Sequence, residues 1–122
     1  MFEKCPCGAG ASYLTCCAPL HLGQRAAASP EQLMRSRYSA FARRDAAYLL
    51  TSWAPETRPP GVGDLSGQEW LGLTVHDAPP PEGDVGFVEF SAKLREGGRN
   101  ATIRERSRFR REDGRWFYVG EA

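Results

Sequence analysis

The residues of this chain best suited to chemistry are its four cysteines, which all lie within the first seventeen positions: Cys5, Cys7, Cys16 and Cys17. Eight residues separate the Cys5-Pro6-Cys7 segment from the Cys16-Cys17 pair. A tetrahedral Zn²⁺ takes four thiolates at about 2.3 Å and needs no other ligand. Because such a site leaves no position open for water or substrate, we expect a structural Zn²⁺ rather than a catalytic one.

Disulfides, free thiols and a histidine ligand are the alternatives to this zinc site. The adjacent residues Cys16 and Cys17 could bridge only through a strained ring, and positions 18–122 hold no cysteine with which a secreted domain would be cross-linked. His21 is the one rival ligand, but the soft thiolate of Cys17 suits zinc better. We therefore predict that the four cysteines hold the ion.

Length and composition indicate one compact domain with a small appendage. The chain has 122 residues, of which 41% are hydrophobic and 25% charged, as in globular proteins. Its net charge of +1 provides no overall field that would draw it to nucleic acid or to anionic lipid. The first residues form no apolar signal segment, and no stretch reaches the roughly 20 apolar residues of a membrane span. We expect a cytoplasmic protein that does not bind membranes.

Two consecutive helices are predicted after the cysteines. Ser29 suits the N-cap of a helix and Pro30 its first position, and the apolar spacing continues to about residue 44. Asp45 can cap a second helix over 46–53, which must end before Pro55. Residues 70–76 indicate a strand, or a short helix that leads into one.

The last third of the chain predicts an antiparallel meander. Its strands are expected at 85–95, 100–111 and 115–121, with Gly-Gly and Asp-Gly pairs as the turns between them. These turns place Phe90 opposite Glu105 on a mostly apolar face. The predicted fold class is α+β, with a zinc knuckle over 1–28 and one further domain over 29–122.

Glu105 would lie in the middle of that apolar face, where an unpaired carboxylate is costly. Arg35 or Arg37 of the first helix is its expected partner. We favour a buried ion pair that fixes the helix on the sheet, and the alternative is the polar floor of a ligand pocket. The pocket would be lined by Arg35, Arg37, Tyr38, Trp53, Trp70, Glu105, Ser107 and Trp116. No nucleophile pattern is evident, and we predict no catalytic residue.

The opposite face of the meander is rich in arginine. It carries Arg104, Arg106, Arg108 and Arg110, with Phe87 and Phe117 among them. Basic strands with exposed aromatic rings are typical of RNA-binding sheets. We favour the other interpretation, a solvated or dimer-forming face on which arginine stems cover the rings and Glu89 lies opposite Arg106.

Two parts of the sequence resemble known families. The segment Cys5-Pro6-Cys7-Gly8-Ala9-Gly10, with Tyr13 and Cys16-Cys17, resembles the SEC-C zinc motif, named after the tail of the SecA translocation ATPase. The segments Leu33-Met34-Arg35-Ser36-Arg37-Tyr38, Trp70-Leu71-Gly72-Leu73 and Glu105-Arg106-Ser107-Arg108-Phe109 resemble the bacterial YchJ-like family. The resemblance implies a cone-shaped domain like nuclear transport factor 2 (NTF2) behind the knuckle. It implies no established activity.

These observations predict a zinc-binding protein that is not an enzyme. Its main expected role is that of an interaction module, a monomer or homodimer that presents the knuckle to a protein or ribosomal partner. Two alternatives stay open at this point. One is a small-ligand-binding or hydrolytic domain that uses a pocket near Glu105, and the other is RNA binding by the arginine-rich strand face.

Overall fold

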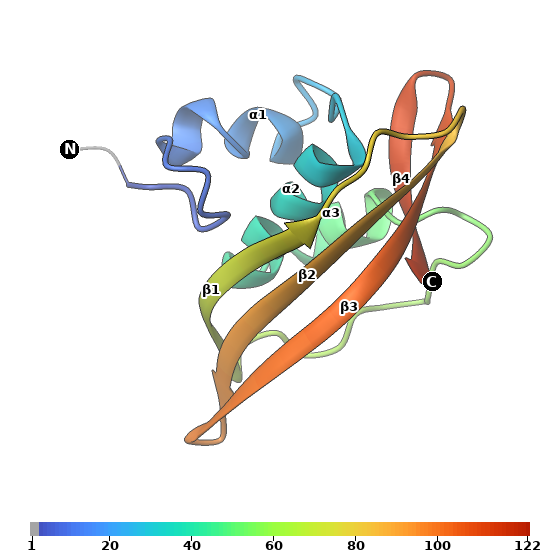
Figure 1. Cartoon of the computed structure of the whole chain (residues 1–122). Coiled ribbons are helices and arrows are strands. Elements are labelled where there is room, and N and C mark those ends of the chain that lie inside the picture. The colour runs from blue at the N-terminus through green and yellow to red at the C-terminus, as the bar shows by residue number, and fades with distance from the viewer. Residues whose placement is uncertain (1–2) are drawn as a thin grey trace.

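The computed structural model describes residues 3–122 and has an α+β architecture (Figure 1). One antiparallel sheet has the strand order β1-β2-β3-β4. Its strands are β1 (Gln68–Asp77), β2 (Val85–Glu96), β3 (Arg99–Glu112) and β4 (Arg115–Glu121). The helical elements are η1 (Tyr13–Thr15), α1 (Ala18–His21), α2 (Pro30–Ala42) and α3 (Ala46–Thr51), and they gather on one side of the sheet. None of the helices within 3–122 is long and apolar enough to cross a membrane.

Both predicted helices form, and both begin as their caps predict. The Ser29 side chain accepts a hydrogen bond from the Gln32 N–H at 3.1 Å, and Asp45 accepts one from the Tyr48 N–H at 3.0 Å. The first helix ends two residues before the predicted position because the chain turns through Arg44, whose φ is 59°. The second helix also ends two residues early, at Thr51.

The predicted meander and its register are confirmed. Phe90 pairs with Glu105 across β2 and β3, and Phe109 pairs with Tyr118 across β3 and β4. The segment that the sequence left open between strand and helix is the edge strand β1, which pairs with β2. The β2–β3 hairpin continues well beyond the helices in Figure 1.

The main core lies between α2 and the sheet. It contains Leu33, Met34 and Tyr38 from α2, and Val88, Ala92, Phe109 and Trp116 from the strands. Leu20 and Ala27, from the predicted knuckle segment, are buried in the same core. A Cβ atom on Gly86 would lie 2.5 Å from Cγ of Pro30, so glycine allows β2 to approach the start of α2 closely.

Candidate metal centre and pocket

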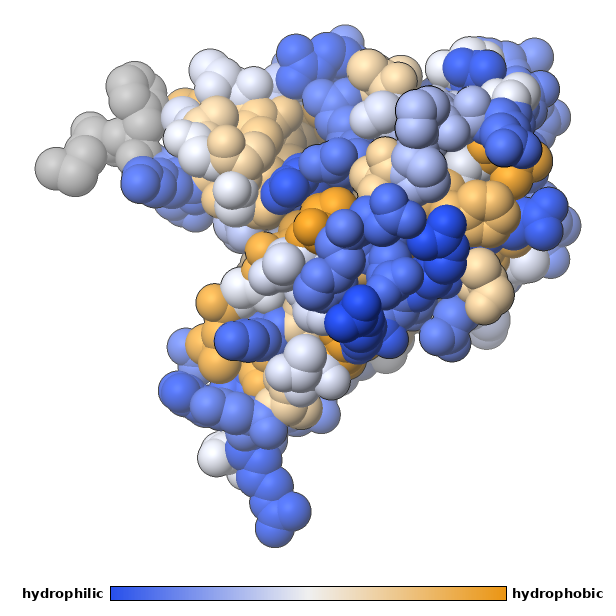
Figure 2. Space-filling view, in the orientation of Figure 1, coloured by the Kyte–Doolittle hydropathy of each residue, from blue (hydrophilic) through white to orange (hydrophobic). Residues whose placement is uncertain are grey.

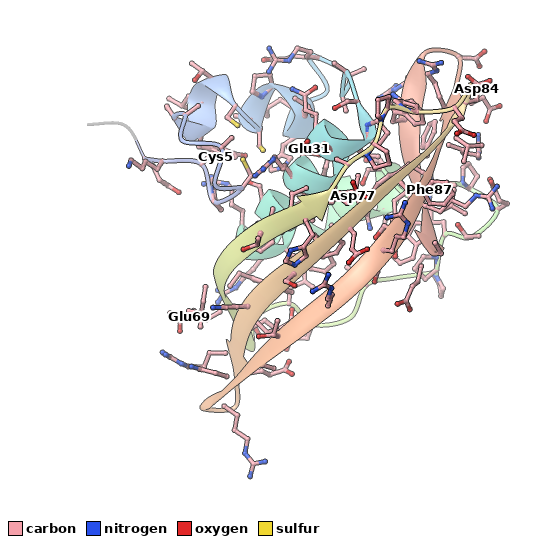
Figure 3. All side chains as sticks on the ribbon, in the orientation of Figure 1. Cys5, Glu31, Glu69, Asp77, Asp84 and Phe87 are labelled. Carbon is pink, nitrogen blue, oxygen red and sulfur yellow. The ribbon has the colours of Figure 1, made fainter. Side chains whose placement is uncertain are left out.

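The four cysteine sulfur atoms converge on one point beside α2. All four lie within 4.8 Å of one another, with Sγ of Cys16 at 3.6 Å from Sγ of Cys7 and 4.0 Å from Sγ of Cys17. Figure 3 shows the sulfur atoms gathered near the Cys5 label. A tetrahedral zinc site with arms of about 2.3 Å has edges of about 3.8 Å. The number, chemistry and spacing of the donor atoms therefore fit a Zn²⁺ ion.

Local backbone structure brings the two cysteine pairs together. Lys4 and Ser12 form an isolated antiparallel bridge, and the Cys5 N–H donates to the Ala11 carbonyl at 2.9 Å. The reversal between them passes through Gly8 and Gly10, whose φ values of 80° and 90° favour glycine. The second pair lies at the start of α1, where Cys17 is the N-cap residue.

The electrostatics of the cluster favour a bound cation. The pKa of Cys7 falls to about 5 because the Cys17 thiol donates a hydrogen bond to it. Burial raises the pKa of Cys16 to about 12, and the pKa of Cys17 rises because its proton is held in the bond to Cys7. At neutral pH the Cys7 thiolate is therefore charged beside the protonated thiols of Cys16 and Cys17. A divalent cation would allow the remaining thiols to ionise as well.

Besides the Ala28 N–H, which donates to Oε1 of Gln32 at 2.6 Å, three polar contacts join the knuckle, defined here as residues 3–28, to helix α2. Nη1 of Arg35 donates to the Cys7 carbonyl at 2.8 Å, and Sγ of Cys5 lies 3.7 Å from Oγ of Ser39. The third contact comes from His21, whose Nε2 lies 2.8 Å from the Ser36 carbonyl oxygen. Its Nδ1 lies 2.7 Å from the Tyr13 hydroxyl. Both ring nitrogens of His21 are therefore occupied by protein partners, and His21 is no part of the sulfur cluster.

A cavity of about 240 Å³ lies between α2 and the sheet, around Glu105. Six of the eight predicted pocket residues line it: Arg37, Tyr38, Trp53, Trp70, Glu105 and Ser107. The sequence analysis missed Gln68 and Tyr118, which also line it. Tyr118 could have been found, because the predicted register pairs it with Phe109 on the apolar face. Gln68 could not have been found, because it lies outside the segment 70–76 that the sequence indicated as a strand or a short helix leading into one.

The other two predicted residues, Arg35 and Trp116, lie outside this cavity. Arg35 is two positions before Arg37, and two residues correspond to about 200° around a helix, so its side chain points to the knuckle instead. Trp116 is buried in the main core near Gly86, with the Arg111 guanidinium 5.0 Å from its ring centroid. The helix and the strand face were predicted correctly, but neither determines which of their side chains reach the cavity.

The expected ion pair between Glu105 and an arginine does not form. Instead Glu105 Oε2 accepts hydrogen bonds from the Ser107 hydroxyl and, at 2.9 Å, from the Tyr118 hydroxyl. Nη1 of Arg37 donates to the Leu49 carbonyl at 2.8 Å and to the Ser52 hydroxyl at 2.6 Å. Arg37 does not need the carboxylate, because main-chain and hydroxyl oxygens also satisfy the donors of a buried arginine.

Aromatic rings enclose the Arg37 guanidinium. Its central carbon lies 5.0 Å from the Trp53 ring centroid and 4.4 Å from that of Tyr118. Burial lowers the pKa of Arg37 to about 10, so the side chain is still charged at neutral pH. The nearby Glu105 carboxylate favours the charge of Arg37. The pKa of Tyr118 is raised mainly by burial and next by the Glu105 charge. The pocket therefore has one positive and one negative group at its polar end.

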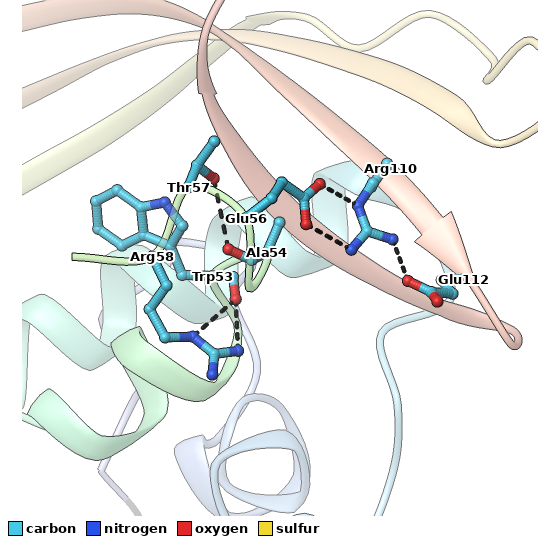
Figure 4. A network of polar contacts seen from close by, with 7 residues as sticks. All are labelled: Trp53, Ala54, Glu56, Thr57, Arg58, Arg110 and Glu112. Atoms are coloured by element: carbon cyan, nitrogen blue, oxygen red, sulfur yellow. Dashed lines mark hydrogen bonds and ion pairs between the residues drawn. The ribbon is translucent and has the colours of Figure 1, made fainter. Parts of the chain in front are cut away.

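The arginine-rich outer face is largely paired with acids. The ion pairs join Arg104 to Glu89, Arg106 to Asp77 and Glu89, and Arg110 to Glu56 and Glu112. Figure 4 shows the last of these networks, and Figure 2 shows hydrophilic residues over the strands at the centre of this view. The guanidinium carbons of Arg106 and Arg110 lie 5.3 Å and 5.4 Å from the ring centroids of Phe87 and Phe117. Glu89 lies opposite Arg106, as the sequence predicted.

Comparison with known proteins gives a consistent set of similarities. The family described as YchJ, middle NTF2-like domain, matches residues 29–121. A UPF0225 protein of Deinococcus radiodurans is 47% identical over 122 residues, which cover 99% of this chain and 90% of that protein. The solution structure of a SEC-C motif containing protein from Rhodopseudomonas palustris is similar with a TM-score of 0.86 and 38% identity, over 98% of both chains. A crystal structure of a SEC-C motif containing protein from Psychrobacter arcticus, 24% identical, has the same fold, with a TM-score of 0.81 over 96% of this chain and 80% of that one.

Proposed function

Since the chain belongs to the YchJ-like family, with an NTF2-like domain behind a SEC-C-like cysteine segment, we propose that it is a zinc-stabilised protein that binds a small molecule in the pocket beside Glu105. The observation that carries this proposal is the pocket itself. It is walled by aromatic side chains and has the charged groups of Arg37 and Glu105 at one end. Apolar cavities with a few converging polar groups are typical of small-molecule sites.

In this proposal the zinc ion has a structural role. Cys5, Cys7, Cys16 and Cys17 would hold it, and it would supply the folding free energy of a segment that has little core of its own. Such ions contribute on the order of 10–16 kcal/mol in small peptides. The contacts of Arg35 with Cys7 and of His21 with Ser36 join the knuckle to α2, whose other face lines the pocket.

The geometry favours binding over hydrolysis. Ser107 is the only hydroxyl-bearing serine or threonine among the residues that line the pocket, and it is 1% exposed. Its hydroxyl donates to Glu105, which also accepts from Tyr118. A nucleophile must reach the substrate carbonyl or phosphorus atom, and the burial of Ser107 opposes that.

The tryptophans provide a direct test of the pocket. The chain has three, and Trp53 and Trp70 line the pocket whereas Trp116 does not. We expect one- and two-ring compounds to shift the indole N–H resonances of Trp53 and Trp70 in the zinc-loaded protein and to leave that of Trp116 unchanged. Ala92→Phe, which fills the cavity, should abolish the shifts, and Ser91→Phe on the outer face should retain them. Equal shifts at all three indoles, or none, would refute the pocket as a binding site.

A protein-docking role of the knuckle is the second candidate. Leu14 and Leu22 are 63% and 70% exposed, more than the other exposed large apolar residues of the described chain, and both lie on the knuckle. Exposed apolar side chains of this size are typical of interaction sites. The test compares the double variant Leu14→Ser/Leu22→Ser with the control Leu71→Ser, whose side chain is exposed on β1. If the knuckle binds a protein or ribosomal partner, only the double variant should lose that binding. Both variants should retain zinc.

A further inference from the structure

The polar end of the pocket has both hydrogen-bond donors and an acceptor that no protein group uses within residues 3–122. Nη1 of Arg37 uses both of its hydrogens, on Leu49 and Ser52, whereas Nε and Nη2 have no protein partner among residues 3–122. Glu105 accepts both of its hydrogen bonds at Oε2, and its Oε1 likewise has no partner in the described structure. An occupant that meets both side chains can therefore accept from one and donate to the other.

The charges at this end already balance. Arg37 contributes one positive charge and Glu105 one negative charge, and both line the same cavity. A ligand with a net charge would add an unpaired ion in a site of low polarity, which is costly. An uncharged group that has a hydrogen-bond donor beside an acceptor would add no unpaired ion. The balance therefore favours a neutral polar end.

The remaining lining residues favour a ligand whose apolar part is flat. Tyr38, Phe41, Trp53, Trp70 and Phe90 present rings to the cavity. An apolar cavity of about 150 Å³ accommodates benzene, and this one measures about 240 Å³. One ring with a polar substituent, or two fused rings, matches that volume.

Three further atoms of the wall lack partners. The indole nitrogens of Trp53 and Trp70 and Oε1 of Gln68 are buried and make no hydrogen bond within residues 3–122. A buried polar atom without a partner costs about 1–3 kcal/mol. They are closed off from solvent as the side chains stand, so the choice of ligand rests on Arg37 and Glu105.

From these observations we infer that the pocket takes a small planar ring compound whose polar end is uncharged and presents a hydrogen-bond donor next to an acceptor, as a carboxamide or a lactam edge does. This inference rests on the proposed function, since it specifies the ligand class of the same pocket. The acceptor of the ligand would meet Arg37 and its donor would meet Oε1 of Glu105.

Three compounds of the same shape separate the possibilities. Benzamide, benzoate and benzamidine share one ring and differ in whether the polar end is neutral, negative or positive. Titrated into the full-length, zinc-loaded protein and followed at the Trp53 and Trp70 indole resonances, benzamide is expected to bind at least ten-fold more tightly than either ion. Toluene, which has no polar end, should bind more weakly than benzamide by a similar factor.

Glu105→Gln tests the charge balance directly. The amide keeps the shape and can still accept from Tyr118, but Arg37 is then left as the one charged group of the pocket. In this variant the affinity for benzoate should rise at least ten-fold relative to the affinity for benzamide. Glu89→Gln, which removes a carboxylate from the outer face, should leave the preference unchanged. The three-compound comparison in the unaltered protein remains decisive if the variant is too unstable to titrate.

The outcomes distinguish this inference from the proposed function. If all three compounds and toluene shift Trp53 and Trp70 with similar affinity, the pocket binds small molecules and the inferred polar end is wrong. Tighter binding of benzoate or benzamidine to the unaltered protein overturns the charge argument in the same way. If no compound moves either resonance up to its solubility limit, the pocket is no binding site and both proposals fail.

Discussion

Nη1 of Arg35 donates a hydrogen bond to the main-chain carbonyl of Cys7 at 2.8 Å, and this contact links the cysteine-bearing knuckle to the helix that lines the pocket. The same side chain forms an ion pair with Glu31 at 3.0 Å. Arg35 and Arg37 extend from opposite sides of α2, so Arg35 contacts the knuckle whereas Arg37 lines the pocket. The two candidate sites are therefore structurally connected.

Replacing Arg35 should weaken the knuckle without removing its ligands. In Arg35→Gln the charged donor to the Cys7 carbonyl is lost, and a hydrogen bond from a charged group contributes about 1.5–3 kcal/mol. We expect one zinc per chain, faster transfer of zinc to a chelator, and a fall of about 1.5 kcal/mol in the free energy of unfolding. The control Glu31→Gln, which breaks only the partly exposed ion pair, should cost about 0.5 kcal/mol or less. Equal effects of the two variants would contradict the assigned role.

Replacing His21 should reduce stability and leave the metal content unchanged. His21→Phe retains a ring near Tyr48, whose centroid is 4.6 Å away, but loses the contacts with Tyr13 and the Ser36 carbonyl. We expect a loss of about 1–3 kcal/mol from the unpaired polar groups, measured by urea unfolding. Elemental analysis should still find one zinc per chain, and a substoichiometric result would make His21 a ligand after all.

The outer face should not bind RNA strongly. Three of its four arginines, Arg104, Arg106 and Arg110, form ion pairs with four carboxylates, those of Glu56, Asp77, Glu89 and Glu112. Arg108 forms no ion pair within residues 3–122. Binding to a single-stranded RNA should be weak, and the double variant Arg106→Ala/Arg108→Ala should change it little. An affinity that falls steeply with salt, and whose salt dependence decreases in the double variant, would instead support RNA recognition.

Stability should fall at alkaline pH because of the tyrosines. The chain has four, and burial raises the pKa of Tyr13, Tyr38, Tyr48 and Tyr118 in the folded protein. In the unfolded chain they lose protons near pH 10, whereas the folded protein retains them, so raising the pH above about 10 favours unfolding by linkage. Arg37 acts in the opposite direction, since its pKa is lowered on folding, but it is one group against four.

Two measurements check this alkaline prediction. The ultraviolet absorbance of tyrosinate should rise at higher pH in the folded protein than in urea. The free energy of unfolding in urea should decline towards about pH 11. In Tyr118→Phe its slope against pH should be smaller than in the unaltered protein, by up to about 1.4 kcal/mol per pH unit. A folded protein whose tyrosines all titrate near pH 10 would contradict the burial that the structure assigns to them.

Local signals explain why much of the fold could be predicted. The Ser29 and Asp45 side chains cap the helices, and the short turns after β2 and β3 set the register of the meander. Both kinds of signal act over a few residues and do not depend on the rest of the fold. The cysteine cluster is similar, because two close pairs need only one reversal of the chain to meet.

The partners of individual side chains could not be predicted in the same way. The sequence placed Glu105 correctly on the pocket face, but its actual partners are Ser107 and Tyr118 rather than an arginine. Which side of α2 faces the sheet depends on how the knuckle packs against that helix, and this is a property of the whole fold. Trp116 was misplaced for the same reason, since its burial depends on the close approach of β2 to the start of α2.

We propose that Cys5, Cys7, Cys16 and Cys17 hold one zinc ion and that no other ligand takes part. X-ray absorption at the zinc edge of the freshly purified protein tests it most directly. We predict one zinc per chain with four sulfur neighbours at about 2.3 Å, and a loss of that signal in Cys16→Ser. A preparation without zinc, or a spectrum with a nitrogen or oxygen neighbour in the unaltered protein, would contradict the claim.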